Sequence, residues 1–192
     1  MLCAGVDEVG RGALFGAVVA CAVILPADCA PQLIAWGVKD SKKLSPRKRQ
    51  VLATQIQELA IAWGIGTATP AEIDQLNILQ ATFWAMERAI MALTPRPEHI
   101  WVDGNQPIPF RLIQPIPQTT IIRGDSSNLS IACASILAKV WRDRLIEALA
   151  KDYPQYDLAQ NKGYGTAKHR QAIREYGYTP LHRHSFRLAH SG

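Results

Sequence analysis

Two apolar runs near the amino terminus, separated by a glycine-rich segment, constrain the fold of this chain more than any other feature. Residues 2–7 form a short apolar run, and residues 17–25 (AVVACAVIL) form a longer one that is rich in β-branched side chains. Such side chains favour strands, and glycines permit the tight reversal of direction that joins two strands. The sequence therefore predicts a β-hairpin.

Helical and extended patterns alternate along the rest of the chain. Residues 26–44 contain two prolines and many polar groups, so we expect a loop there. Thr69-Pro70-Ala71-Glu72 matches a capping box with proline at the first helical position. The predicted helices run from Pro46 to the glycine at 64, from Pro70 to about 93, from the end of the GDSS segment at 124–127 to about 150, and over 167–176. The further predicted strands are 63–69, 99–102 and 118–123.

This order of elements is typical of an α/β fold. We expect a mixed sheet of about five strands flanked by helices, with a small helical piece at the carboxyl end. The 192 residues suit one domain of ordinary size, and a hydrophobic content of 48% is enough for a buried core. We expect a core over residues 1–150 and a basic helical extension over residues 151–192 that packs on it.

Positive charge is concentrated in two segments of a chain whose formal net charge is +5. Residues 39–49 (KDSKKLSPRKR) and residues 161–192 each contain six lysines or arginines and one acid, so the rest of the chain is net negative. Two basic segments on an otherwise acidic chain favour contact with a polyanion such as a nucleic acid. Each segment alone is equally typical of a solvated helix face.

The cysteines and the apolar segments bear on the protein's location. Cys3, Cys21, Cys29 and Cys133 show neither a CxxC pair nor a metal-binding spacing. Free thiols favour a reducing compartment, so we expect a cytoplasmic protein. The apolar run at 13–25 is too short to span a bilayer, and we expect no contact with a membrane.

Four acidic residues lie at the ends of predicted elements. Asp7 and Glu8 follow the first strand, Asp103 follows the strand at 99–102, and Asp125 lies between the last strand and the long helix. If these strands are neighbours in one sheet, the four carboxylates converge at one edge. Converging carboxylates repel one another and suit a hard divalent cation such as Mg²⁺ or Mn²⁺, which in such sites promotes phosphodiester hydrolysis.

Each acid also has a plain structural interpretation. The DGN segment at 103–105 is typical of a β-turn, Asp125 is typical of a turn that caps the following helix, and the adjacent acids at 7–8 are typical of a surface. Their shared position at element ends, together with the two basic segments, favours catalysis. Spacing alone leaves the convergence of the acids open.

Gly10-Arg11-Gly12 directly follows the first acidic pair. Glycines that flank an arginine allow main-chain N–H groups to approach a phosphate or a ribose closely. The segment lacks the GxGxxG spacing of a dinucleotide-binding loop, and the same glycines would serve a tight hairpin turn.

Six segments together resemble a known enzyme family. VDEVGRG, VKDSKKLS, WVDGN, IIRGDSSNLSIACASILAKVWRDR, NKGYGT and TPLHRHSF occur in this order between residues 6 and 186. In order and spacing they are similar to type 2 ribonuclease H (ribonuclease HII) of bacteria. The resemblance implies a ribonuclease H-like fold, Mn²⁺ or Mg²⁺ as cofactor, and endonucleolytic cleavage of RNA in RNA–DNA hybrids. It also implies cutting 5′ of ribonucleotides embedded in duplex DNA, which leaves a 5′-phosphate and a 3′-OH.

The resemblance also implies roles for individual residues. The family's metal-binding catalytic carboxylates fall on Asp7, Glu8, Asp103 and Asp125. Its substrate-binding residues fall on Gly10, Arg11 and Gly12, which recognise the ribose 2′-hydroxyl, on Tyr164, which stacks at the RNA–DNA junction, and on Lys42, which contacts a phosphate. The basic segment at 161–192 is expected to bind the duplex backbone. The protein is expected to act as a monomer.

The chain departs from the family in a few places. Ala13-Leu14-Phe15 stands where the family usually has proline and a small residue, which removes no ligand and leaves Phe15 without an assigned role. The related ribonuclease HIII lacks the GRG loop, so the presence of that loop in this chain favours type 2. The tail histidines, including His169 and His182, are expected to be solvated or to face phosphates.

Two other functions fit part of the sequence. A non-catalytic nucleic-acid binder would explain the basic segments, but it would gain nothing from four carboxylates beside phosphates. A junction resolvase of the same fold would share the metal site, and equal cutting of an all-DNA duplex would distinguish it.

Overall fold

The predicted hairpin forms the centre of the sheet. The computed structural model describes residues 1–38, 41 and 44–186. β1 (Cys3–Val9) and β2 (Val18–Ile24) pair antiparallel within a five-stranded sheet of order β3-β2-β1-β4-β5. The other strands are β3 (Ala62–Ala68), antiparallel to β2, and β4 (His99–Asp103) and β5 (Gln118–Ile121), which add parallel to β1 and to β4 in turn. The predicted mixed five-stranded sheet is therefore confirmed.

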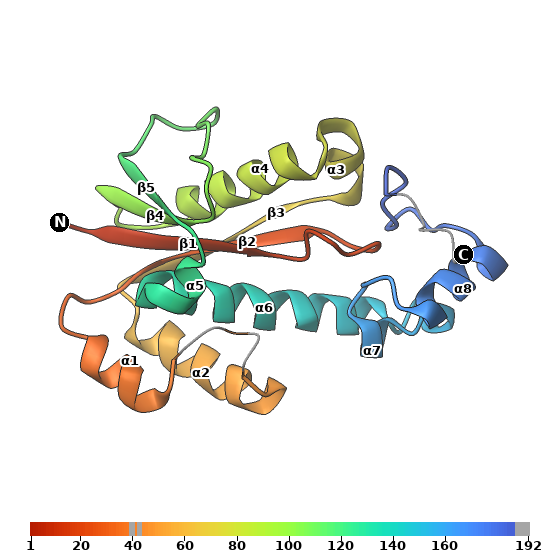
Figure 1. The fold of residues 1–192 in the computed structure, drawn as a ribbon, viewed down its shortest axis with the longest axis horizontal. Coiled ribbons are helices and arrows are strands. Elements are labelled where there is room, and N and C mark those ends of the chain that lie inside the picture. Colours follow the sequence, from red (N-terminus) through yellow and green to blue (C-terminus); the bar gives the residue numbers. More distant parts are fainter. Residues whose placement is uncertain (39–40, 42–43, 187–192) are drawn as a thin grey trace.

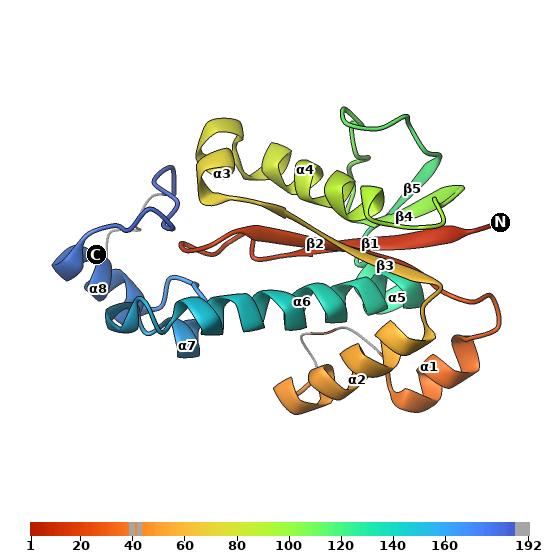
Figure 2. The ribbon, with the colours of Figure 1, turned by 180° about the vertical axis from the view of Figure 1, so that it is seen from behind.

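Helices cover both faces of the sheet (Figure 1). The main ones are α4 (Ile78–Met91) on one face, α6 (Leu129–Leu149) on the other, and α2 (Pro46–Leu59), which packs outside α6. The shorter ones are α1 (Ala30–Trp36), α3 (Pro70–Leu76), α5 (Gly124–Ser127), the 3₁₀ turn Pro154–Tyr156, α7 (Leu158–Asn161) and α8 (Ala167–Tyr176). Figure 2 shows from behind that α7 and α8 lie at the carboxyl end of α6, on the side to which the hairpin points. Within the described ranges, no helix is both long and apolar enough to cross a membrane.

Small residues let the helices approach the sheet closely. Gly5 of β1 lies against the backbone of Ser130 in α6, and Gly66 of β3 lies against that of Ala85 in α4. A Cβ at either glycine would overlap main-chain atoms of the helix. Every residue of β2 is fully buried between the two helical layers. This packing holds the first half of α6 directly against the strand that carries the first acidic pair.

Two predicted boundaries are wrong. The predicted loop at 26–44 contains α1, because Pro31 fits the first turn of a helix and Gly37, with a φ of 78°, ends that helix in the left-handed conformation. The helix that begins at Pro46 ends at Leu59 rather than at residue 64, because the chain has already entered β3 by then.

One asparagine divides a predicted helix, and another begins the long helix. Asn77, with a φ of 72°, separates α3 from α4, and its Oδ1 accepts from the first amides of α4. Asn128 caps α6 in the same way and leaves residues 124–127 as the single turn α5. The predicted capping box at 69–72 and the predicted helix at 167–176 are confirmed.

Candidate active site

Three of the four predicted acids meet at one edge of the sheet. β1 and β4 run parallel with Val6 beside Val102, so the next residues, Asp7 and Asp103, are neighbours at the carboxyl ends of their strands. Together with Glu8 they line a cavity of about 280 Å³. The other side chains around this cavity include Ser41, Ser135, Lys139 and Tyr164.

Asp7 and Glu8 lie inside β1 rather than after it, which corrects the prediction. They pair with Cys21 and Ala20 of β2. Consecutive strand residues point to opposite faces of a sheet, so the two carboxylates approach the edge from different sides. Asp7 faces Ser135 of α6. Glu8 also borders a smaller cavity, distinct from this one, that lies towards α4.

Burial and repulsion from neighbouring carboxylates raise the pKa of both acids. Burial is the main cause for Asp7, whose pKa is well above its usual range, and the charges of Glu8 and Asp103 raise it further. Burial also raises the pKa of Glu8, although Arg11, whose Nη1 lies 3.4 Å from Glu8 Oε1, offsets part of that rise. Negative charge is therefore costly here, and a cation would relieve the cost.

Main-chain amides orient two of the carboxylates. The N–H of Glu8 donates to Asp7 Oδ1 at 2.7 Å, and the N–H of Gly124 donates to Asp103 Oδ1 at 2.7 Å. The second bond fastens the start of α5 to the end of β4. The hard carboxylate oxygens at this edge are the ligands that Mg²⁺ and Mn²⁺ prefer.

Asp125 adjoins this network without lining the cavity. It is 7% exposed, and it follows Gly124 in the single turn α5. Its predicted role as a fourth ligand stays a prediction. Among the described residues, no three His, Cys, Asp or Glu side chains lie close enough together to hold an ion as they stand.

The GRG segment forms the turn that follows β1, beside Glu8. Gly10 has a φ of 89°, and a Cβ there would overlap the guanidinium of Arg142, so this position requires glycine. The space at Gly12 is open, since a Cβ there would meet nothing within 4 Å. The turn that is predicted to recognise the ribose therefore adjoins the predicted metal ligands.

A buried arginine from α6 holds the main chain behind this turn. Arg142 is fully buried, and its Nε donates to the carbonyl of Ala17 at 3.1 Å. Its Nη1 donates to the carbonyl of Lys162 at 2.8 Å and its Nη2 to that of Phe15 at 3.0 Å. One side chain thus joins α6, the hairpin and the segment after α7.

A second buried arginine reaches the same turn from the carboxyl-terminal piece. Arg183 is 1% exposed, and it donates to the carbonyls of Gly16 at 2.9 Å and of Arg11 at 2.8 Å. Burial, with the neighbouring Arg142 charge, lowers the pKa of Arg183 to about 9. The GRG turn is thereby fixed from behind by residues distant in the sequence.

Tyr164 lies next to the GRG turn, as expected if both bind the same substrate. The N–H of Leu14 donates to the carbonyl of Gly163 at 2.8 Å, and a β-bridge joins Ala13 to Tyr164. The guanidinium of Arg142 lies 5.5 Å from the centroid of the Tyr164 ring. The tyrosine therefore borders the cavity that Asp7, Glu8 and Asp103 line.

Phe15, which had no role assigned from the sequence, fastens the hairpin to the carboxyl-terminal piece. Its ring is fully buried and meets the rings of Tyr153 and His182 edge-on, at centroid distances of 5.6 and 5.1 Å. His169 and His182 are fully buried too, so the prediction that they are solvated is wrong. They pack around Tyr156 instead of facing solvent.

Two serines that the sequence did not single out contribute to the site. The Ser135 side chain hydrogen-bonds to Asp7, and its Oγ lies 2.9 Å from that of Ser41. Ser41 belongs to the first basic segment, which the serine pair therefore connects to the acids. Lys42, the predicted phosphate contact in that segment, lies outside the described residues.

Lys139 is a third residue that sequence reasoning missed. Its Nζ lies 2.7 Å from Asp143 Oδ1 and 6.0 Å from the centroid of the Tyr164 ring. The spacing of Ser135, Lys139 and Arg142 places them on one face of α6, and this periodicity was the available signal. The surrounding apolar residues concealed it, because they predict a helix that is buried all round.

Comparisons with known proteins find relatives that match most of the chain. The family model "Ribonuclease HII" matches residues 4–189. Ribonuclease HII of Acaryochloris marina (strain MBIC 11017) is 58% identical over 183 residues, which cover 95% of this chain and 91% of the relative.

Solved structures share the fold and complete the assignment. RNase HII of Archaeoglobus fulgidus, solved in complex with PCNA, has a TM-score of 0.82 at 27% identity, and the match covers 100% of this chain and 98% of that one. Bst-RNase HIII, solved in complex with Mn²⁺, shares the fold with a TM-score of 0.77 at 21% identity, over 97% of this chain and 67% of that one. The chain therefore belongs to the ribonuclease HII family and is a ribonuclease H endonuclease that acts on RNA–DNA hybrids.

Proposed function

We propose that this endonuclease also cuts duplex DNA on the 5′ side of single embedded ribonucleotides, with Mn²⁺ or Mg²⁺ as cofactor. The products are a 5′-phosphate and a 3′-OH, and the protein acts as a monomer. The observation that carries the proposal is one cavity that joins Asp7, Glu8 and Asp103 to Tyr164, beside the GRG turn.

The proposed metal ligands are Asp7, Glu8, Asp103 and Asp125. Their hard oxygen donors and the raised pKa of Asp7 and Glu8 suit a divalent cation. When bound, such an ion would neutralise charge on the scissile phosphate and make a water molecule more acidic. The carboxylates themselves would draw closer together around the ion, with the amides of Glu8 and Gly124 keeping two of them oriented.

The chain's other residues would recognise and position the substrate. Main-chain groups of Gly10, Arg11 and Gly12 would hydrogen-bond to the ribose 2′-hydroxyl, the group that distinguishes RNA from DNA at the sugar. Tyr164 would stack at the RNA–DNA junction. Lys139 would supply positive charge for a phosphate in the same cavity, with Lys42 doing so from the neighbouring segment. Residues 1–150 would then form the catalytic core, and residues 151–192 would form a basic extension that holds the duplex.

The test compares wild type with Asp7→Asn on matched duplexes that contain no, one or many ribonucleotides, in Mg²⁺ and in Mn²⁺. We expect the variant to bind these duplexes but to cut them roughly a thousandfold more slowly, a barrier increase of about 4 kcal/mol. Asp28→Asn, which changes an exposed aspartate outside the cavity in the same way, should leave the rate unchanged.

Three outcomes would contradict the proposal. Full activity of Asp7→Asn would remove this carboxylate from catalysis. Cutting of hybrids without cutting at a single ribonucleotide would restrict the substrate to hybrids. Equal cutting of the all-DNA duplex would show that the 2′-hydroxyl is not recognised.

A further inference from the structure

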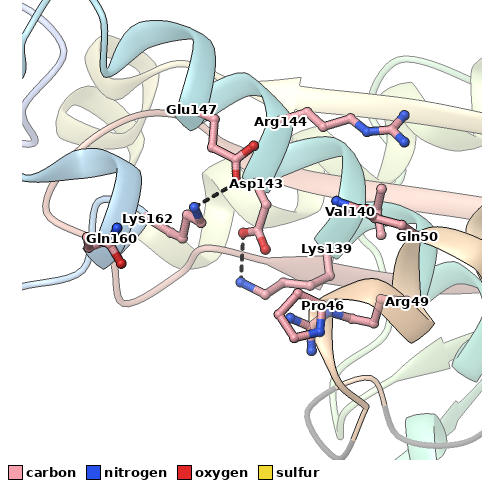
Figure 3. A pocket seen from close by; sticks show the side chains of 10 residues that line it. All are labelled: Pro46, Arg49, Gln50, Lys139, Val140, Asp143, Arg144, Glu147, Gln160 and Lys162. Atoms are coloured by element: carbon pink, nitrogen blue, oxygen red, sulfur yellow. Dashed lines mark hydrogen bonds and ion pairs between the residues drawn. The ribbon is translucent and has the colours of Figure 1, made fainter.

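A second charged cavity, of about 290 Å³, opens between α2, α6 and the end of α7 (Figure 3). Cationic side chains reach it from all three elements: Arg49 from α2, Lys139 and Arg144 from α6, and Lys162 from the residue after α7. Two acids, Asp143 and Glu147, line it as well. The four cationic groups outnumber them, so the cavity keeps an excess of positive charge.

Lys139 belongs to both cavities. It lines the candidate active site together with Asp7 and Tyr164, and it lines the second cavity together with Lys162. The two cavities are therefore neighbours on either side of one lysine. Arg49 strengthens this connection, because its Nη1 donates to the carbonyls of Ser41 at 2.9 Å and Leu44 at 2.6 Å, in the segment that borders the active site.

The two acids hold the lysines in place without cancelling the cavity's charge. Lys139 Nζ lies 2.7 Å from Asp143 Oδ1, and Lys162 Nζ lies 2.7 Å from Glu147 Oε1, as the dashed lines in Figure 3 show. The side chain of Glu147 is 48% exposed, and ion pairs this open to water contribute little. A phosphate group could therefore share or replace Glu147 as the partner of Lys162 at small cost.

We propose that this second cavity is a subsite for a backbone phosphate of the bound duplex, next to the phosphate that is cleaved. The inference rests on the proposed function only in placing the scissile phosphate in the first cavity. Each strand carries a charge about every 3.4 Å along the helix axis, so a duplex anchored at one cavity brings further phosphates to its neighbour. The contact is with the backbone alone, so it is independent of sequence and of the 2′-hydroxyl.

The test uses a short all-DNA duplex, whose affinity is measured by fluorescence anisotropy over a range of salt concentrations. Lys162→Gln should weaken binding about eightfold near 0.1 M salt, because one phosphate contact contributes about 0.9 to the slope of log K against log salt. That slope should become shallower by about the same amount. Arg96→Gln, which removes the same charge from an exposed side chain outside both this cavity and the basic extension, should bind like the wild type.

Glu147→Gln supplies the decisive opposite change. It removes the competing acid and releases Lys162, so it should tighten binding to the duplex. If both cavity variants bind like the wild type, or if Glu147→Gln weakens binding as much as Lys162→Gln does, the ion pair is merely structural and the inference is overturned. If the binding shifts appear but the wild type fails to cut at a ribonucleotide, the proposed function fails and the subsite stands.

Discussion

Arg142 illustrates, at the scale of one residue, how the GRG turn and Tyr164 are held in place beside the candidate active site. Its planar guanidinium offers donors in several directions, and the structure uses them on the carbonyls of Phe15, Ala17 and Lys162 while the group lies beside the Tyr164 ring. A lysine ammonium is a point charge at the end of a flexible stem and cannot reproduce this fork. Arg142 therefore fixes the GRG turn relative to the tyrosine.

We expect Arg142→Lys to lower the free energy of unfolding by roughly 2–4 kcal/mol, because buried carbonyls lose their charged donor. Urea denaturation measures this change. We also expect the variant, at temperatures where it is folded, to discriminate less well between duplexes with and without a ribonucleotide, which competitive cleavage of the two measures.

Arg144→Lys is the matched control for this change. Arg144 lies two residues further along α6 and is exposed, so the same substitution should leave stability and discrimination close to the wild-type values. Equal effects of the two variants would show that burial and the three hydrogen bonds of Arg142 contribute neither to stability nor to discrimination between the duplexes.

The sequence predicted the site residues unevenly. Asp7, Glu8 and Asp103 were predictable because acids at the ends of strands stand out from apolar surroundings, and the structure brings them together. Ser135 and Lys139 were not, since a serine and a lysine on a largely apolar helix have many uses. Their roles depend on which strand α6 packs against, and spacing along the chain does not determine that.

At the scale of elements, two neutral imidazoles join α8 to the segment that follows it. His169 Nδ1 donates to the carbonyl of Tyr164 at 2.9 Å, and the N–H of Thr179 donates to His182 Nδ1 at 3.0 Å. The remaining proton of His182 is therefore on Nε2, which donates to His169 Nε2 at 3.2 Å. Burial lowers the pKa of His169, and burial together with the neighbouring His169 lowers that of His182 to about 4.

We expect acid to destabilise the fold through this pair. As the pH falls from the usual histidine pKa towards about 4, the unfolded chain binds a proton that the folded His182 does not, so stability is lost in that window. The loss through His182 is at most about 3 kcal/mol. The measurement is urea unfolding of wild type and His182→Gln between about pH 7 and about pH 4. The wild type's advantage in stability should shrink as the pH falls, and an advantage that stays constant or grows would contradict the expectation.

Element types were largely predictable, and element ends were less so. The alternating and helical patterns located the five strands and the main helices. α1 was missed because its proline is equally common in loops, and the break at Asn77 was missed because apolar spacing continues through it. In both places a single backbone conformation, not a pattern, determines the outcome.

At the scale of the whole molecule, the carboxyl-terminal piece and the core share one apolar cluster. Phe15 of the hairpin and Ile146 of α6 pack with Tyr156, Leu158 and Ile173. The buried arginines add hydrogen bonds across the same junction. Separation of the two parts would expose these groups, so we expect them to fold together.

The whole chain of 192 residues should therefore unfold in one cooperative transition. Scanning calorimetry checks this through the agreement of the calorimetric and van't Hoff enthalpies. Two resolved transitions, or a stable fragment that ends near residue 150 after limited proteolysis, would show instead that the extension is an independent unit.

The order of the strands within the sheet could not be predicted from the pattern of residues. The order of helices and strands predicted a mixed sheet, but it did not state that β1 lies between β2 and β4. That neighbourhood is what brings Asp103 next to Asp7. It depends on contacts between residues far apart in the chain, which only the folded molecule or the family resemblance supplies.

The central position of β1 also determines how the site responds to thermal motion. The inner part of the strand, up to Val6, has strand partners on both sides, and Gly5 lies directly against α6, whereas Asp7 and Glu8 pair with β2 alone. The opening free energy of such a core strand approaches that of global unfolding, so we expect the amide protons of this inner part to be among the slowest in the protein to exchange with solvent. The repulsion between Asp7 and Glu8 therefore falls on the part of β1 that lies just beyond this doubly paired stretch.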